Sequence, residues 1–220
     1  CMIVVFAILR FKINNAGKKD KEREDDFWER ENEANSTRAV DVSTLDYITI
    51  PLDTLPIHAS ITDEMPKGDP EAEECARAIT GLSERKIMNL SGQSNTDLKL
   101  KYGPANLDFL SQCDDNFTVL VRNLNTLAHR FEELGHPIEA MVILEYAVSI
   151  GSDIKATYAL LGEIYVRTGS RARLEDLKKM ASELPSLSKN GIINKLEELQ
   201  IISLAGEDLD LSEYEDIPEE

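Results

Sequence analysis

The histidines and cysteines of this sequence, which bind transition metals and act as bases or nucleophiles, are few and widely spaced. They are His58, His129, His136, Cys1, Cys75 and Cys113. Two histidines on a helix share a metal ion when they stand about four residues apart, whereas His129 and His136 are seven apart with Gly135 between them. We therefore expect turn and surface histidines, no metal site, and cysteines that remain reduced.

No short catalytic motif is present. The sequence has no Gly-rich phosphate loop, no GxGxxG after a strand, no HExxH, no GxSxG and no EF-hand loop. Its formal net charge of −17 repels phosphate backbones. We predict a chain that is not an enzyme and that binds no cofactor and no nucleic acid.

What the sequence does contain is a repeat of 34 residues over 121–188. The copies span 121–154 and 155–188. Gly135 aligns with Gly169, Phe131 with Tyr165, Leu127 with Leu161, Ala128 with Gly162, and Ala147 with Ala181. The apolar residues recur every three or four positions, which predicts a helix–turn–helix pair in each copy. Gly135 and Gly169 would close the first helix of each pair in a left-handed conformation.

The period is that of the tetratricopeptide (TPR) family. The second copy, Tyr158-x2-Leu161-Gly162-x2-Tyr165, resembles the W-x2-L-G-x2-Y pattern of that family with Tyr in place of Trp, and Ala140-x3-Leu144-x2-Ala147 is similar to its second helix. The resemblance implies that small residues let paired helices approach and that large ones fill the space between pairs. These repeat-packing residues are Leu127, Ala128, Phe131, Gly135, Ala140, Leu144, Ala147, Tyr158, Leu161, Gly162, Tyr165, Gly169 and Ala181.

TPR proteins bind an extended peptide or a helix in a groove lined by the first helix of each pair. Carried over to this chain, the resemblance implies a partner groove formed by Arg122, Asn125, His129, Glu132, Ala156, Ala159, Glu163 and Val166. The set of basic and amide residues that clamps the carboxylate of a chaperone tail in some family members is not reproduced. We therefore do not predict chaperone docking.

The regions around the repeats are expected to complete an all-α, TPR-like antiparallel helical array over 93–202. Because two repeats rarely bury enough surface alone, we predict a capping helix over 190–202 with Ile192, Leu196 and Leu199 inward. Thr96 should cap a short turn, Gly103-Pro104 should restart a helix that runs to Cys113, and Asp114 or Asp115 should cap the next helix.

Residues 40–92 are expected to cover the first repeat. Pro51 and Pro56 limit the apolar stretch 40–61 to an extended segment or a short edge strand. After a loop over 62–70, Asp69 and Pro70 predict the start of a helix over about 70–82, with Cys75, Ala76, Ile79 and Leu82 on one face.

The N-terminal residues indicate a membrane anchor. Residues 1–9 are all apolar and are followed by Arg10 and Lys12. A helix needs about 20 apolar residues to cross a bilayer, so we interpret 1–10 as the end of a truncated transmembrane helix whose basic flank stays in the cytoplasm. A lipidated first cysteine and a secretory signal are the alternatives. Residues 11–39 read as a charged juxtamembrane helix or linker.

Residues 203–220 carry eight acidic side chains and no basic one. We predict an acidic, disordered tail. The whole resembles small bacterial single-pass proteins that carry a few TPR units behind an N-terminal anchor. The expected function is therefore a membrane-tethered cytoplasmic adaptor or scaffold that binds a protein or peptide partner. A regulatory subunit of a membrane complex and an enzyme with its site in 40–115 are the alternatives.

Overall fold

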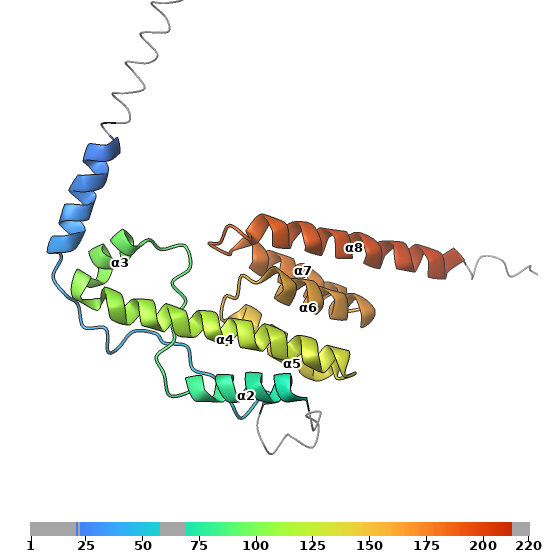
Figure 1. The fold of residues 1–220 in the computed structure, drawn as a ribbon. Helices are drawn as coiled ribbons and strands as arrows, with labels where there is room; N and C mark the ends of the chain where they lie inside the picture. Colours follow the sequence, from blue (N-terminus) through green and yellow to red (C-terminus); the bar gives the residue numbers. More distant parts are fainter. Residues whose placement is uncertain (1–20, 22, 58–68, 213–220) are drawn as a thin grey trace, which may run out of the picture. The chain divides into compact units, whose positions relative to one another are not determined.

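The computed structural model describes residues 21, 23–57 and 69–212, with backbone alone over 205–212. The described residues are all-α, with antiparallel helices and no β-strand. Figure 1 shows the arrangement of the helices within each part. The chain divides into two compact units, Cys1–Leu45 with Gln93–Ser111 and Asp46–Gly92 with Gln112–Glu220. Residues 93–111 belong to the first unit and residues 112–202 to the second. The predicted anchor lies outside the described residues.

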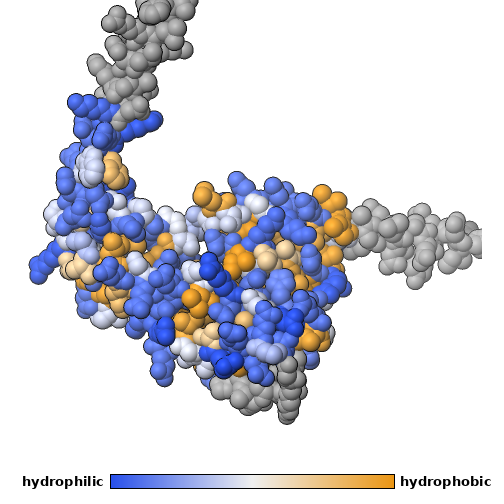
Figure 2. All heavy atoms as spheres, in the orientation of Figure 1, coloured by the Kyte–Doolittle hydropathy of each residue, from blue (hydrophilic) through white to orange (hydrophobic). Residues whose placement is uncertain are grey.

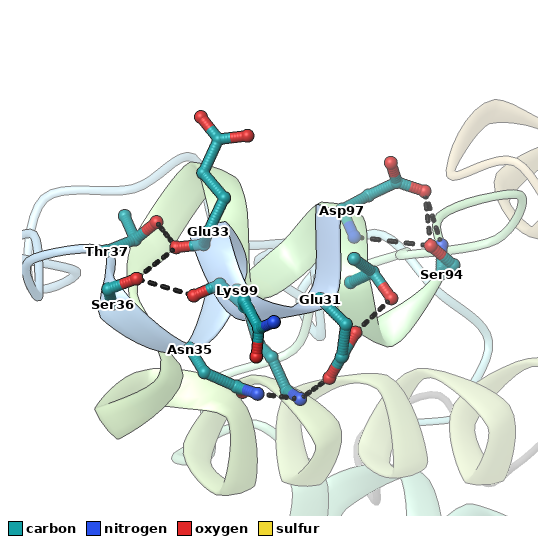
Figure 3. A network of polar contacts seen from close by, with 10 residues as sticks. Glu31, Glu33, Asn35, Ser36, Thr37, Ser94, Asp97 and Lys99 are labelled. Atoms are coloured by element: carbon teal, nitrogen blue, oxygen red, sulfur yellow. Dashed lines mark hydrogen bonds and ion pairs between the residues drawn. The ribbon is translucent and has the colours of Figure 1, made fainter. Parts of the chain in front are cut away.

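In the first unit, residues 23–36 are helical and are held to α3 (Asn95–Tyr102) by a polar network (Figure 3). Lys99 pairs with Glu31 and donates to Asn35 at 2.9 Å, and Thr96 donates to Glu31 at 2.8 Å. The hydrogen bond from Lys99 lowers the pKa of Glu31. The C-terminal part of the predicted juxtamembrane helix is thus bound to α3, whereas Phe27 and Trp28 are exposed.

The start of α3 and the course of α4 (Leu107–Glu133) differ from the prediction. Ser94, rather than Thr96, caps α3 through a reciprocal capping box with Asp97. After the 3₁₀ turn η1 (Pro104–Asn106), α4 continues without the expected break at Asp114 or Asp115. The Asp114 carboxylate accepts a hydrogen bond from the distant Leu90 N–H at 2.9 Å, so it holds another segment instead of capping a helix.

The second unit begins with residues 46–92, which consist of irregular segments and α2 (Pro70–Leu82). The α2 bounds, the Asp69 cap and the buried face of α2 confirm the prediction. Residues 46–57 form no strand, yet the Ile48 N–H donates to the Ile87 carbonyl at 2.9 Å, and Ile50, Leu55 and Ile57 are buried. These are the residues that the apolar pattern placed against the helical body.

The remaining helices follow one another through short turns: α5 (Pro137–Ser149), α6 (Lys155–Arg167), α7 (Arg171–Ser182) and α8 (Lys189–Ser212). Gly135, Gly151 and Gly169 have positive φ. After Gly135, the His136 N–H donates to the Phe131 carbonyl at 2.8 Å, and after Gly169 the Ser170 N–H donates to the Tyr165 carbonyl at 2.8 Å. This pattern is the Schellman motif, which satisfies the last carbonyls of a helix and reverses the chain.

The position of Gly162 corrects one expectation about the packing. An added Cβ at Gly162 would stand 2.8 Å from Leu199 Cδ1 and 3.0 Å from Leu196 Cδ2, both on α8, but 3.5 Å from Leu174 Cδ1 on α7. The closest approach is therefore made by α8 and not by the paired helix α7. The sequence could not indicate which helix packs against Gly162, because a small residue predicts a close neighbour but not its identity.

The capping helix extends beyond its predicted end at 202. Ile192, Leu196 and Leu199 are buried as expected, but α8 continues to Ser212. The first part of the predicted disordered tail is therefore helical, and 213–220 lie outside the described residues. No proline stands between Lys189, where α8 begins, and Pro218. Arg171 donates to the Ser203 carbonyl at 3.0 Å. Figure 2 shows apolar groups scattered among hydrophilic ones on the face that it draws. On α8, Ile201, Ile202 and Leu204 are exposed.

The packing at Gly162 predicts a stability difference between two glycines. Gly162→Val places a branched side chain against Leu196 and Leu199, and overpacking costs about 1–3 kcal/mol, which lowers Tm by roughly 3–10 °C in a protein of this size. In α2, an added Cβ at Gly81 has no neighbour within 4 Å, so Gly81→Val is the matched control. Thermal melts that give both variants the same Tm would contradict this packing of α8.

Candidate functional site

The residues predicted to line a partner groove lie on α4 and α6. We call them the α4/α6 face: Arg122, Asn125, His129 and Glu132 on α4, and Ala156, Ala159, Glu163 and Val166 on α6. Arg122, Ala156 and Glu163 are exposed, and the other members are half-buried. The repeat-packing residues lie beneath, buried except for the turn glycines Gly135 and Gly169.

Two polar contacts join α4 and α6 at this face. The buried Thr157 hydroxyl donates to Asn125 Oδ1 at 3.0 Å, and Arg167 pairs with Glu132 Oε1 at 2.6 Å. The other Glu132 oxygen is buried and has no hydrogen-bond partner among the described residues. Asn125 and Glu132 thus join the two helices, whereas Arg122, Ala156 and Glu163 are the exposed members of the face.

The third helix at this face is α8, which sequence analysis treated as a cap alone. It packs against both α6 and α7, and Lys195 reaches Glu163 Oε1 at 3.3 Å. Lys195 stands between the inward positions Ile192 and Leu196, at the edge of the buried stripe. That edge position was the available signal that Lys195 would meet a neighbouring helix.

The chemistry that this surface offers is recognition through side-chain contacts. Over residues 21, 23–57 and 69–212, no group of three or more His, Cys, Asp or Glu side chains is placed to hold a metal ion, and His58 lies outside these ranges. Cys75 and Cys113 are buried free thiols, and burial raises the pKa of each, which disfavours the reactive thiolate.

On the second-helix side lies a hollow that sequence analysis missed. It has a volume of about 250 Å³ and lies between α5 and α7 over the buried α6 residues Leu161 and Tyr165. The Tyr165 hydroxyl donates to Glu145 Oε1 at 2.7 Å, and Arg173 pairs with the same oxygen at 3.0 Å. Burial, aided by that hydrogen bond, raises the pKa of Tyr165, so its hydroxyl stays protonated at neutral pH.

Comparison of the chain with protein-family models, curated proteins and solved structures finds no match in any of the three. Among the helices that the structure describes, none combines the length and apolar character needed to cross a bilayer.

The contact between Glu132 and Arg167 predicts a coupled stability effect. Arg167→Met leaves a half-buried carboxylate without its cation and should destabilise the protein by about 1 kcal/mol, because an unsatisfied group costs about 1–3 kcal/mol and the exposure of Arg167 reduces that cost. Adding Glu132→Met should restore most of the loss. Lys195→Met is the control, because the carboxylate that it leaves unpaired, Glu163, is 47% exposed against 20% for Glu132. Chemical denaturation gives the free energy of unfolding of the wild type and the three variants. A double variant no more stable than Arg167→Met would contradict the coupling.

Proposed function

We propose that the chain is a TPR-type partner-binding module that binds a peptide or helix of another protein on its α4/α6 face. The observation that carries this proposal is the correspondence between the two copies. Residues 34 positions apart occupy matching places: Phe131 and Tyr165 are both buried at the last turn of a first helix, and each helix ends in the same glycine motif.

The second helices support the same correspondence. Ala147 of α5 and Ala181 of α7 are both fully buried, and Ile143 and Leu177 are buried at matching positions. Leu174 stands where the first copy has Ala140, and both are buried. The exchange of Ala for Leu at this position therefore leaves it buried in both copies.

A third first-helix position is filled by α8. In such an array each first helix packs against both helices of the preceding pair, and α8 contacts both α6 and α7. The row α4, α6 and α8 presents exposed polar, charged and small side chains on one surface. A surface of this mixed character, with Arg122 and Glu163 exposed, suits an extended peptide or a polar helix face.

The proposal includes attachment to a membrane with the described helices in the cytoplasm. It is supported by the apolar residues 1–9 and by the basic residues that follow them. In this setting the module is an adaptor or scaffold that holds its partner at the membrane.

Site-specific photocrosslinking tests the binding face. A photoreactive residue at Arg122 or at Ala156 should capture the same partner from cells, because both side chains are exposed on that surface. Ile138 at the start of α5, which is 68% exposed, is the control position. Introducing Ala156→Trp should abolish the adduct at Arg122 by occupying the surface. Equal capture at Ile138 would contradict the assignment of the face.

Fractionation of cells that express the full protein tests the attachment. The protein should stay in the membrane pellet after a high-salt and an alkaline wash, because a spanning helix is released by neither. A tag at the C-terminus should resist external protease in intact cells. Release by alkali alone would exclude a spanning anchor, and digestion of the tag would reverse the topology.

A further inference from the structure

The hollow on the second-helix side continues into a second one. The first is lined by α5, α6 and α7, and the second, of about 230 Å³, adds Asn89 and the end of α7. Val148 and Met180 line both hollows, so the two form one trough. Leu161, Leu177 and Tyr158 are buried beneath it, and Met180 is 44% exposed at its rim. An apolar floor beside an exposed, adaptable methionine is typical of a surface that accepts a side chain.

The first repeat shows what covers the corresponding position. Met180 stands 34 residues after Tyr146, and the Tyr146 hydroxyl donates to the Thr49 carbonyl of the extended segment at 3.3 Å. In that segment Ile50 is buried, and Ile48 and Leu52 pack against the core. The chain therefore lays one of its own extended segments over the first copy, and the equivalent place on the second copy is open.

The charged side chains around the trough indicate which kind of peptide would bind there. Arg173 is paired with Glu145 at 3.0 Å, which compensates that carboxylate. The other two carboxylates of the lining, Asp176 and Glu183, have no hydrogen bond or ion pair within the described part of the chain. An occupant with a basic side chain next to its apolar anchor would neutralise them. The Tyr158 hydroxyl, which also lacks a partner among the described residues, adds a donor for a peptide carbonyl.

We propose that the trough between α5 and α7 docks an extended peptide of a partner protein, in which a branched apolar side chain is followed closely by lysine or arginine. The apolar side chain enters the hollow over Leu161 and Leu177 beside Met180, and the basic side chain meets Asp176 or Glu183. This site uses the repeat correspondence of the proposed function, but it lies on a different face from the one assigned there.

A peptide copied from the chain provides the probe. Fluorescein-labelled residues 46–57, with Asp46→Lys and Asp53→Lys, retain the apolar pattern of the covering segment and supply positive charge. Anisotropy titration of the full chain in mild detergent should give saturable binding. The unmodified acidic peptide should bind at least about tenfold more weakly, and the difference should shrink at high salt because exposed charges are screened.

Variants of the protein locate the binding site. Met180→Asp should weaken the lysine peptide by about tenfold or more, and Asp176→Lys with Glu183→Lys should reverse the preference between the two peptides. These side chains are exposed, and unchanged melting temperatures will show that the variants fold. The control variant is Ile138→Asp, which should leave the affinity unchanged because Ile138 is exposed and lines neither surface.

The outcomes separate the two proposals. Absence of saturable binding, or equal binding by wild type and the Met180→Asp variant, would overturn the trough as a docking site. Equal binding of the two peptides would overturn the prediction that the occupant carries a basic side chain. If crosslinking at Ala156 fails while the lysine peptide binds and Met180→Asp weakens that binding, the α4/α6 face is overturned and the trough stands.

Discussion

The packing of α6 against three neighbours is the constraint on which the second unit depends. α6 packs against α5, α7 and α8, and seven of its 13 residues are buried. Each large apolar side chain buried in this way contributes about 1.5–3 kcal/mol. The buried residues surround the helix because neighbours stand on several sides of it, and Gly162 leaves the space that the leucines of α8 occupy. Displacing α6 would therefore uncover all three partners at once.

The directions of the helices are set by their ends. Gly135, Gly151 and Gly169 adopt a left-handed conformation, and each is followed by an N–H that reaches back to a helical carbonyl. Residues with a Cβ pay a steric penalty there, which is the physical reason that the turn falls on glycine. The close spacing of these turns keeps successive helices antiparallel and brings residues 34 apart into equivalent surroundings.

The N-terminal side of the second unit is closed by irregular chain, and polar side chains make that possible. Buried backbone groups outside helices need partners, and the helices and loops supply them. Asn116 donates to the Lys86 carbonyl at 2.9 Å, Asp114 accepts from the Leu90 N–H, and Asn89 donates to the Gly151 carbonyl at 3.0 Å. On the second helix of the first copy, Tyr146 donates to the Thr49 carbonyl of this irregular chain, whereas the second copy has a trough at the corresponding place.

The amino-acid sequence by itself determined the elements whose signals are local. The Asp69-Pro70 start of α2, the turns at Gly135 and Gly169, and the inward face of α8 follow from capping, left-handed φ and a spacing of three or four. Each depends on residues within one or two turns of chain. The helix pairs and the surface positions Arg122 and Ala156 could therefore be named in advance.

Only the tertiary structure decided the contacts between segments that are distant in sequence. Asp114 looked like a helix cap, but a segment 24 residues away takes its carboxylate. Residues 23–36 lie in the predicted juxtamembrane helix or linker, and the pair of Glu31 and Lys99, which are 68 residues apart, holds them to α3. The trough depends on how α5 and α7 stand over α6. A single polar or small residue is compatible with many neighbours, and its partner is chosen when the whole chain buries its apolar surface.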